Sequence, residues 1–425
     1  MRKMAAISFL ASADSRKFTL SSPVNSPEQV LSLRVQSIKE SPTLAITAKA
    51  AKYKSDGRPI IGLAAGEPDF DTPQHIKDAA KKAIDDGFTK YTPVSGIPSL
   101  KKAIVNKFKN ENGFDYNVNE VIVGVGGKQT IFNLCLAVLN KGDEVIVPAP
   151  YWVSYADIAM VAEATPVIVQ CGIEQGFKLT PKQLEAAITP NTKLFMINSP
   201  SNPTGTVYSL AELKALGEVL LKHPQVLVAT DDMYEHVNLT GEKFYNILNA
   251  APGLKDRCIV LNGVSKAYSM TGWRIGYAAG PAYIIKAMEI LQSQSTSNPT
   301  SISQVAAQAA LEGSQECIVP MVIAFKERHQ YVVNRFNQMP GLSCLMAGGA
   351  FYAFPDARAA IQHLFNAGTI NAKTDMALAE YLLEKFDVAV VPGSAFGAEG
   401  YFRISFATSM DNLRNALDRI EKALS

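Results

Sequence analysis

The residue best suited to covalent chemistry is a lysine in a loop of small residues. Lys266 follows the apolar run Cys258–Leu261, and Arg274 lies eight residues further on. A lysine at the end of a buried strand loses hydration, which lowers the pKa of its amine and makes the amine a nucleophile. An arginine nearby can bind a phosphate with two hydrogen bonds. The pair predicts a nucleophilic amine beside a phosphate site, whereas an isolated lysine would be a solvated surface charge.

A second phosphate signal is the glycine-rich turn at residues 124–129. The turn ends a β-branched run and opens a helical one, where backbone N–H groups bind phosphate. Gln129 stands where the dinucleotide fingerprint needs a glycine and where the nucleoside-triphosphate loop needs Ser or Thr, and that loop also needs a glycine in place of Ile122. We therefore expect a phosphate-binding turn that is not a nucleotide motif, with a simple strand-to-helix turn as the alternative.

Two further charged residues occur in apolar strands. Asp231 follows the run Val226–Ala229, and a carboxylate at this end of a strand faces the crevice where α/β proteins bind ligands. We expect its neighbour Asp232 to be solvated. Arg403 interrupts the apolar run at 402–406 and needs an anionic partner, because an unpaired buried charge is costly. That partner is either a substrate carboxylate or a structural salt bridge.

From residue 72 onward, helical and strand patterns alternate. Thr72 is expected to cap a helix that has Pro73 in its first turn and ends at Gly87. Strands are predicted at 121–125, 144–147, 167–169, 194–197, 226–229, 259–261 and 275–278. Helices are predicted between several of them, at 129–139, 181–188 and 210–221. Near-continuous apolar strands separated by helices indicate an α/β fold with a parallel sheet that is covered on both faces.

After about residue 310 the pattern changes to a smaller α+β arrangement. Its expected helices span 320–338, 375–385 and 410–423, and its short strands span 351–354, 388–391 and 402–406. We predict an N-terminal leader and arm (1–43), a large cofactor-binding domain (71–310) and a small domain formed by 44–70 and 311–425.

Composition excludes several classes of protein. With 41 Lys and Arg against 39 Asp and Glu, the chain lacks the basic field that nucleic acid requires, and its apolar runs are too short for a membrane span. Five scattered cysteines predict buried thiols in a reducing compartment rather than a disulfide or metal framework. The Ser-rich first 30 residues are interpreted as a disordered leader of a cytoplasmic protein, with an organelle transit peptide as the alternative.

Residues 263–276 resemble, position for position, the lysine signature of class I and II aminotransferases of the type I pyridoxal-phosphate fold. The resemblance extends over nearly the whole chain from about residue 30. It implies a mostly parallel seven-stranded sheet flanked by helices, a smaller α+β domain and a homodimer with shared active sites. It also implies that Lys266 carries pyridoxal 5′-phosphate and moves a proton, as base and then as acid, while amino groups pass between small amino acids and 2-oxo acids.

The resemblance assigns further cofactor contacts. Asn202, in Ser-Asn-Pro-Thr-Gly, and Tyr234 would bind the phenolic oxygen, and Asp231 would pair with the protonated pyridine nitrogen. The remaining cofactor contacts would be the backbone amides of Gly127 and Lys128, the Arg274 side chain, Trp152 against the ring, and Tyr91, which related enzymes lend across a dimer interface.

The resemblance also assigns substrate contacts. Arg403 would bind the α-carboxylate with help from the Gly66 backbone, beside Trp152 and Asn202. The Gly-Gly-Lys-Gln turn resembles the Iβ subgroup of aspartate aminotransferases, in which the lysine reaches the distal carboxylate, so Lys128 would take that role. Thr43 matches a threonine of bifunctional aspartate/prephenate aminotransferases. Gly263 departs from the serine that many relatives place three residues before the lysine, which removes one phosphate contact.

Two other functions fit part of this pattern. Another pyridoxal-phosphate enzyme of the same fold, a lyase or an aromatic aminotransferase, would use the same lysine. A non-catalytic binding module could keep the fold, but it would not need a proton-transfer lysine. The choice among aspartate, glutamate and prephenate as main substrate is left open by the sequence.

Overall fold

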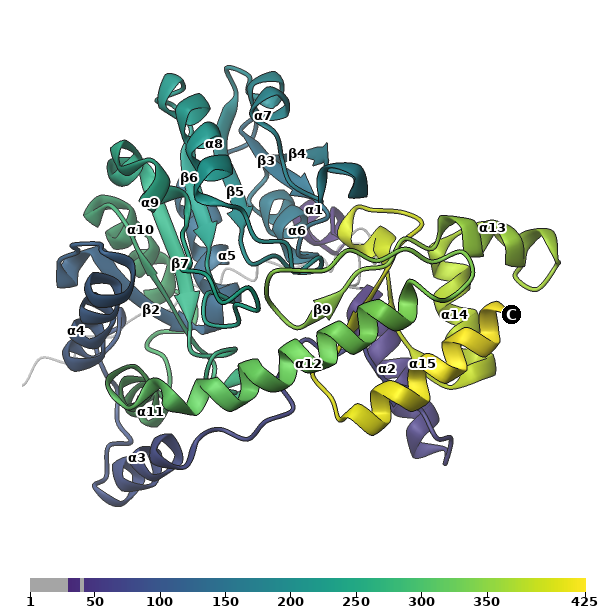
Figure 1. The fold of residues 1–425 in the computed structure, drawn as a ribbon. Coiled ribbons are helices and arrows are strands. Elements are labelled where there is room, and N and C mark those ends of the chain that lie inside the picture. Colours follow the sequence, from purple (N-terminus) through teal and green to yellow (C-terminus); the bar gives the residue numbers. More distant parts are fainter. Residues whose placement is uncertain (1–29, 39–41) are drawn as a thin grey trace, which may run out of the picture.

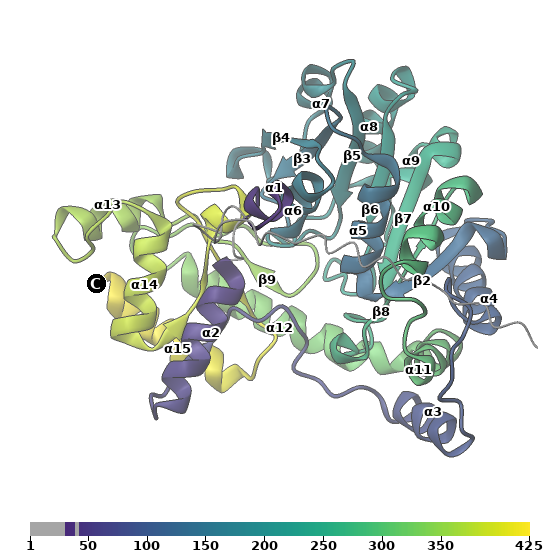
Figure 2. The same ribbon diagram turned by 180° about the vertical axis from the view of Figure 1, so that it is seen from behind.

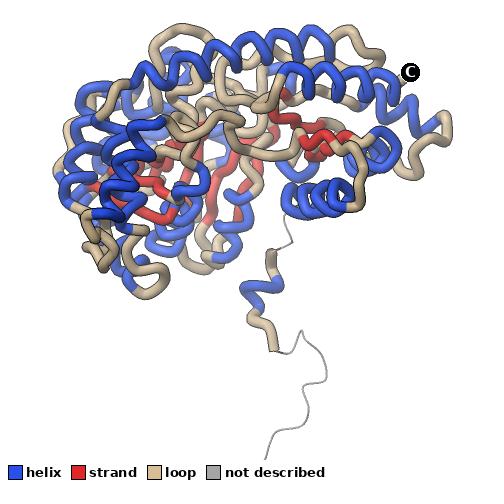
Figure 3. Tube along the Cα trace, turned by 90° about the horizontal axis from the view of Figure 1, so that it is seen from below, coloured by secondary structure: helices blue, strands red, loops and turns tan. Residues whose placement is uncertain are grey.

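The computed structural model describes residues 30–38 and 42–425, so almost all of the predicted leader lies outside the described residues. One large sheet and two small ones are enclosed between helices (Figures 1 and 3). No helix within the described part of the chain is long and apolar enough to cross a membrane.

The large sheet has seven strands in the order β2-β8-β7-β6-β5-β3-β4. They span Val121–Val125 (β2), Glu144–Ala149 (β3), Thr165–Gln170 (β4), Thr192–Asn198 (β5), Leu227–Asp231 (β6), Cys258–Gly263 (β7) and Ile275–Ala279 (β8). Strands β4, β3, β5, β6 and β7 pair in parallel, while β8 is antiparallel to both β7 and β2. The predicted mostly parallel seven-stranded sheet is confirmed.

Alternation along the central strands divides the core into two layers. On β5, Leu194 and Met196 pack in one cluster and Phe195 and Ile197 in the other, because successive side chains of a strand point to opposite faces. Figures 1 and 2 show the sheet from its two sides, with helices over each face. The helices of this part of the molecule are α3 (Gln74–Asp85), α4 (Pro98–Lys107), α5 (Gly126–Val138), α6 (Ser154–Val161), α7 (Pro181–Ala187), α8 (Leu210–Lys222), α9 (Ile247–Ala250), α10 (Ala282–Ser293) and α11 (Ser301–Glu312). Of these, α3 packs against α11 and lies away from the sheet.

The start of α3 differs from the prediction. The helix begins at Gln74 with Pro73 as its N-cap, so the expectation that Thr72 caps it was wrong. The Thr72 hydroxyl instead donates to the Ser269 carbonyl at 2.7 Å and accepts the Trp273 indole N–H at 3.0 Å. Thr72 therefore ties the chain before α3 to the loop that carries the candidate lysine, and this tertiary contact outweighs a local cap.

The smaller part of the molecule combines segments from before and after the large sheet. Strand β1 (Ile61–Gly62) pairs in parallel with β10 (Val388–Ala389), while β11 (Val391–Pro392), β12 (Phe402–Ser405) and β9 (Tyr352–Ala353) form a three-stranded sheet. The remaining helices are α1 (Leu33–Gln36), α2 (Pro42–Ser55), α12 (Val319–Phe336), α13 (Arg358–Asn366), α14 (Asp375–Phe386) and α15 (Met410–Leu424). Helix α12 runs from beside α11 to this smaller part (Figure 1). The predicted boundary at 310/311 falls inside α11, and the domain limits stay a prediction.

Candidate active site

A cavity of about 390 Å³ opens at the carboxyl ends of the parallel strands, between the large sheet and the smaller part of the molecule. Strand ends meet at this edge, so residues distant in sequence converge there. The cavity is lined by most of the residues singled out from the sequence: Gly66, Gly127, Lys128, Trp152, Asn202, Asp231, Tyr234, Lys266, Arg274 and Arg403.

Lys266 lies three residues after β7, and its Nζ donates a hydrogen bond to the Gly66 carbonyl at 2.5 Å. Burial lowers the pKa of Lys266 to about 8, with Glu67 opposing this and Arg274 adding to it. At neutral pH a larger share of this amine is uncharged than in a solvated lysine. The environment thus favours a nucleophile and a proton carrier at Nζ.

Asp231, the last residue of β6, is held by one donor on each carboxylate oxygen. The Tyr155 hydroxyl donates to Oδ2 at 2.5 Å, and the Met233 backbone N–H donates to Oδ1 at 3.2 Å. Burial raises the pKa of Asp231, while these two hydrogen bonds lower it because they favour the charged form. A cation placed in the cavity would pair with this carboxylate. Tyr155 was not predicted from the sequence.

Asp232 is not solvated, which corrects the expectation from the sequence. It is 1% exposed, and it accepts hydrogen bonds from the Thr230 hydroxyl and the Asn246 amide, each at 2.6 Å. Burial raises the pKa of Asp232 well above its usual range. Asp232 also does not line the cavity, since successive residues of an extended chain point to opposite sides. Its role is to join the end of β6 to the start of α9.

Two asparagines form the wall beside Asp231. Asn198 ends β5, and its amide donates to the Asp231 carbonyl at 2.8 Å, while its side-chain oxygen accepts the Asn202 backbone N–H at 2.8 Å. The Asn202 side-chain oxygen in turn accepts a hydrogen bond from Arg403 Nη1 at 2.9 Å. The predicted Asn202 is therefore fixed by Asn198, which the sequence analysis missed.

Arg403 is a buried guanidinium without an acidic partner. It is 3% exposed, its Nη2 donates to the Ala64 carbonyl at 2.7 Å, and its Nε has no hydrogen-bond partner. The guanidinium carbon lies 4.5 Å from the centroid of the Tyr352 ring and 4.9 Å from that of Phe396. No carboxylate within residues 30–38 and 42–425 forms an ion pair with Arg403, so the structural salt bridge considered above is not found there. A buried cation that faces a cavity in this way is suited to bind a carboxylate.

The first turn of α5 and Arg274 together form an anion site. A side chain on Gly126 would overlap the Arg274 guanidinium, and one on Gly127 would come within 2.5 Å of Met233 Cε. Gly126 also has φ +79°, a conformation that favours glycine. The glycines thus allow the guanidinium to lie against a helix N-terminus, where backbone N–H groups and the helix dipole attract negative charge.

Lys128, the next residue of α5, extends over an aromatic ring. Its Nζ lies 5.1 Å from the centroid of the Trp152 ring. Burial and the neighbouring Arg274 lower the pKa of Lys128, and Asp157 on α6 raises it. None of the described acidic residues forms an ion pair with this lysine.

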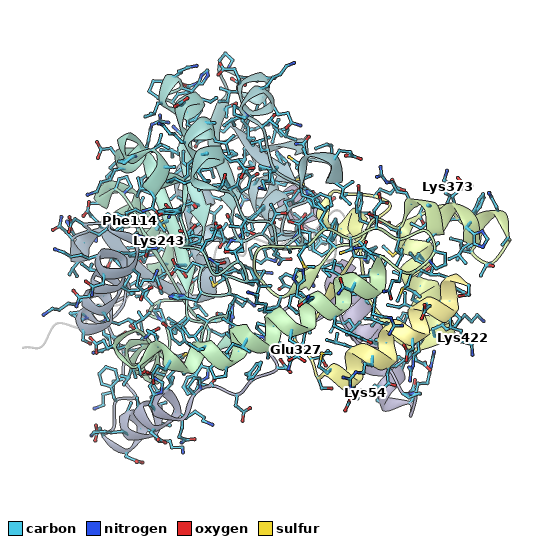
Figure 4. The ribbon with its side chains drawn as sticks, viewed as in Figure 1. Lys54, Phe114, Lys243, Glu327, Lys373 and Lys422 are labelled. Atoms are coloured by element: carbon cyan, nitrogen blue, oxygen red, sulfur yellow. The ribbon has the colours of Figure 1, made fainter. Side chains whose placement is uncertain are left out.

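The charges of the cavity differ from those of the outer surface. Lys373 and Lys422, which Figure 4 labels, lie exposed at the periphery of the molecule. Lys128, Arg274 and Arg403 converge on one cavity of about 390 Å³, in which Arg403 is buried while Lys128 and Arg274 stay solvent-exposed. Cations gathered in a partly desolvated cleft attract anions, and here they suit a ligand with several negative groups.

Tyr234 is paired with a second tyrosine that the sequence did not reveal. The hydroxyls of Tyr234 and Tyr352 lie 2.9 Å apart, and both side chains are buried. A Cβ on Gly66 would lie 2.9 Å from the Tyr352 hydroxyl, so this glycine allows the hydroxyl to approach the backbone closely. Tyr352 therefore lies beside Gly66, which binds Lys266, and beside Arg403 itself.

Of the two remaining predicted site residues, Tyr91 does not line the cavity and Thr43 is described only by its backbone. Tyr91 is 93% exposed, and its assignment to a partner chain's site stays a prediction. Thr43 lies in the first turn of α2, and its side chain is outside the described residues. Thr47, one helical turn later, lines the cavity, so α2 does approach the site.

Comparisons with known proteins agree over nearly the whole chain. A sequence model of the family described as "Aminotransferase class I and II" matches residues 58–420. The aspartate/prephenate aminotransferase of Nitrosomonas europaea is 62% identical over 395 residues, which cover 93% of this chain and 100% of that protein. The aspartate aminotransferase structure from Rhizobium meliloti has a TM-score of 0.87 at 50% identity, covering 93% of this chain and 98% of that one. That of Thermus thermophilus with maleate has a TM-score of 0.86 at 42% identity, covering 92% and 99%.

Proposed function

The chain belongs to the class I and II aminotransferases, and from this membership we propose that it moves the amino group between aspartate or glutamate and 2-oxoglutarate or oxaloacetate. Enzymes of this family depend on pyridoxal phosphate. The observation that carries the substrate proposal is the presence, in one cavity, of the amine of Lys266 and the buried guanidinium of Arg403 without an acidic partner.

The residues present fit pyridoxal phosphate. The absence of a side chain at Gly126 lets Arg274 lie against the start of α5, where the guanidinium and the helix N-terminus would bind the phosphate together. Asp231 offers a buried carboxylate for the ring nitrogen, and Tyr234 and Asn202 offer donors for the phenolic oxygen. The Trp152 ring would pack against the cofactor.

When bound, pyridoxal phosphate supplies an electron-withdrawing ring that stabilises negative charge at the substrate Cα. Lys266 Nζ would take the proton from the substrate Cα as a base and deliver it, as an acid, to the cofactor carbon that had carried the aldehyde, a task favoured by the lowered pKa of this amine. The Gly66 carbonyl, which accepts a hydrogen bond from Nζ at 2.5 Å, keeps the amine at the cavity wall. Arg403 fixes the α-carboxylate and thereby the direction of the Cα–H bond.

The distal end of the substrate would be read by Lys128. Its amine lines the cavity without a carboxylate partner among the described residues, which suits the second carboxylate of aspartate or glutamate. We also propose activity on prephenate, which carries two carboxylates and would give arogenate. The sequence contains both Thr43 and Lys128, and this combination, together with the names of the Nitrosomonas europaea and Cereibacter sphaeroides relatives, supports the extension.

A homodimer with shared sites, in a cytoplasmic enzyme of amino-acid biosynthesis, completes the proposal. Tyr91 is 93% exposed, and Phe88 and Ile84 nearby are 39% and 52% exposed, so this end of α3 presents an uncovered apolar surface. A second copy would cover it and bring Tyr91 to the partner's phosphate. The domain limits 44–70 with 311–425, and 71–310, belong to the same proposal.

Steady-state kinetics test the function. We expect oxaloacetate and glutamate as the products of aspartate and 2-oxoglutarate, with ping-pong kinetics and the loss of turnover in Lys266→Ala. Release of alanine with carbon dioxide, or of ammonia, without formation of glutamate would identify a lyase instead. A protein that takes up no pyridoxal phosphate would be a binding module. Thr43→Val and Lys128→Ala, assayed with oxaloacetate and prephenate, assign the second substrate.

A further inference from the structure

The Asp231 carboxylate depends on few contacts for its orientation. It is 9% exposed, and within residues 30–38 and 42–425 it accepts hydrogen bonds only from Tyr155 and from the Met233 backbone. The Met233 amide is two residues away on the same chain segment and moves with Asp231. Tyr155 is therefore the donor that anchors the carboxylate from another structural element.

Tyr155 is itself held rigidly. It lies in the first turn of α6 and is 3% exposed, and its ring meets that of Trp152 edge-to-face at a centroid distance of 5.4 Å. A tyrosine side chain has two torsion angles that place its ring, and packing of Tyr155 in a buried cluster restricts both. A small cavity of about 20 Å³ behind the site is lined by Tyr155 together with Asn198 and Tyr208.

We propose that Tyr155 is a positioning residue that fixes the Asp231 carboxylate for the ring nitrogen of the cofactor. This inference rests on the proposed function, in which Asp231 pairs with that nitrogen. Each carboxylate oxygen has a second lone pair beyond the one that Tyr155 or Met233 occupies, so the carboxylate can accept a third donor from the cavity without moving. The Tyr155 hydroxyl also favours the charged carboxylate, which a protonated ring nitrogen requires.

The test compares two cofactors on the same apoprotein. Pyridoxal phosphate carries the ring nitrogen, and its deaza analogue has a C–H group in that place. Quenching of tryptophan fluorescence gives the Kd of each, since Trp152 lines the cavity. We expect Tyr155→Phe to raise the Kd of pyridoxal phosphate about tenfold and to change the Kd of the analogue less than about twofold. Kinetics of the loaded enzyme should show a lower kcat and an unchanged KM for aspartate.

A matched control removes a similar hydroxyl that does not touch Asp231. Tyr208 lines the same small cavity, is 5% exposed, and its hydroxyl accepts the Leu179 backbone N–H at 2.7 Å. Tyr208→Phe should alter neither the Kd of pyridoxal phosphate nor that of the analogue. In an Asp231→Ala background, Tyr155→Phe should cause no further loss, because the two residues act as one unit.

The outcomes separate two failures. If Tyr155→Phe raises the Kd of both cofactors equally, or changes neither as Tyr208→Phe does, Tyr155 has no positioning role. The proposed function still stands in that case if Asp231→Ala raises the Kd of pyridoxal phosphate but not that of the analogue. If Asp231→Ala binds both cofactors as the wild type does, the role of Asp231 in the proposed function is wrong and Tyr155 has nothing to position. Should Tyr155→Phe not fold, Tyr155→His keeps a ring and an N–H donor. Tyr155→His must bind pyridoxal phosphate more tightly than the deaza analogue, and equal Kd values for the two in folded protein would contradict the proposal.

Discussion

Replacement of Arg403 by methionine should separate substrate binding from stability. The guanidinium is 3% exposed and its Nε has no partner, so the free protein carries the cost of a buried charge that the substrate carboxylate would neutralise. Removing one member of a buried charge pair costs about 2–5 kcal/mol. We therefore expect kcat/KM for aspartate to fall by about 30-fold to several thousand-fold.

The same change should not destabilise the protein without substrate. Methionine fills much of the space between Tyr352 and Phe396, whose rings lie 4.5 and 4.9 Å from the guanidinium carbon, and it needs no counter-charge. The apoprotein Tm of Arg403→Met should equal or exceed that of the wild type. Arg403→Lys keeps the charge but not the bidentate geometry, so its kcat/KM should lie between those of the wild type and Arg403→Met.

A surface arginine provides the control. Arg358 is 54% exposed on its side chain and pairs with Asp356, so Arg358→Met should leave both kcat/KM and the cofactor Kd unchanged. The assay is aspartate with 2-oxoglutarate, together with a cofactor titration and a melting curve for each variant. A fall in kcat/KM of less than about fivefold in Arg403→Met, or a fall that merely follows a lower Tm and weaker cofactor binding, would refute the assignment of the substrate carboxylate to Arg403.

Four further outcomes are expected. Burial lowers the pKa of Lys266 to about 8. The charged amine is therefore disfavoured in the folded apoprotein. Urea unfolding should show that Lys266→Met raises the free energy of unfolding of the apoprotein by at most about 3 kcal/mol below pH 8. This stabilisation should vanish as the pH rises to 10.5. Lys128→Ala should lower kcat/KM for oxaloacetate about 10- to 100-fold, while kcat/KM for a monocarboxylic 2-oxo acid should stay within about threefold of the wild-type value. An equal loss for both substrates would contradict a role of Lys128 at the distal carboxylate. The buried Glu235 forms an ion pair with Lys107. Burial alone would raise the pKa of this carboxyl, but Lys107, His236 and Asn112 outweigh that effect and lower the pKa to about 2. The contribution of the charged Glu235 to stability is present above about pH 4.5 and is lost as the pH falls through 2. Glu235→Gln should therefore lower the free energy of unfolding by about 3–5 kcal/mol at pH 7 and by much less near pH 2. An equal loss at both pH values would argue against the pair with Lys107. Finally, Tyr91→Ala mixed with Lys266→Ala should recover up to about a quarter of wild-type activity if the dimer shares its sites, whereas no recovery in a proven mixed dimer would show that it does not.

The sequence was informative where a functional residue conflicts with its surroundings. Arg403 in an apolar strand and Lys266 in a loop after one are both costly unless they serve a ligand, and both line the cavity. The seven strands were predicted because their apolar runs are short, β-branched and separated by helices. Their order and the reversed direction of β8 are set by tertiary pairing that local patterns do not encode.

The residues missed from the sequence act through distant partners. Tyr155 meets a carboxylate 76 positions away, and Tyr352 meets a hydroxyl 118 positions away. Nothing in the neighbouring residues distinguishes these tyrosines from ordinary core aromatics. Asp232 was wrongly expected to be solvated for a related reason, since Asn246, one of the two donors that satisfy the buried carboxylate, becomes its neighbour only in the fold.

The most direct test of the central claim is to locate the cofactor on the chain. Borohydride reduction of the protein loaded with pyridoxal phosphate, followed by proteolysis and mass spectrometry, should find one phosphopyridoxyl group per chain, on Lys266. Prior addition of aspartate without a 2-oxo acid should abolish the label, because the amino form of the cofactor is not attached to the lysine. A label on Lys128 or another lysine, or no label at all, would contradict the account.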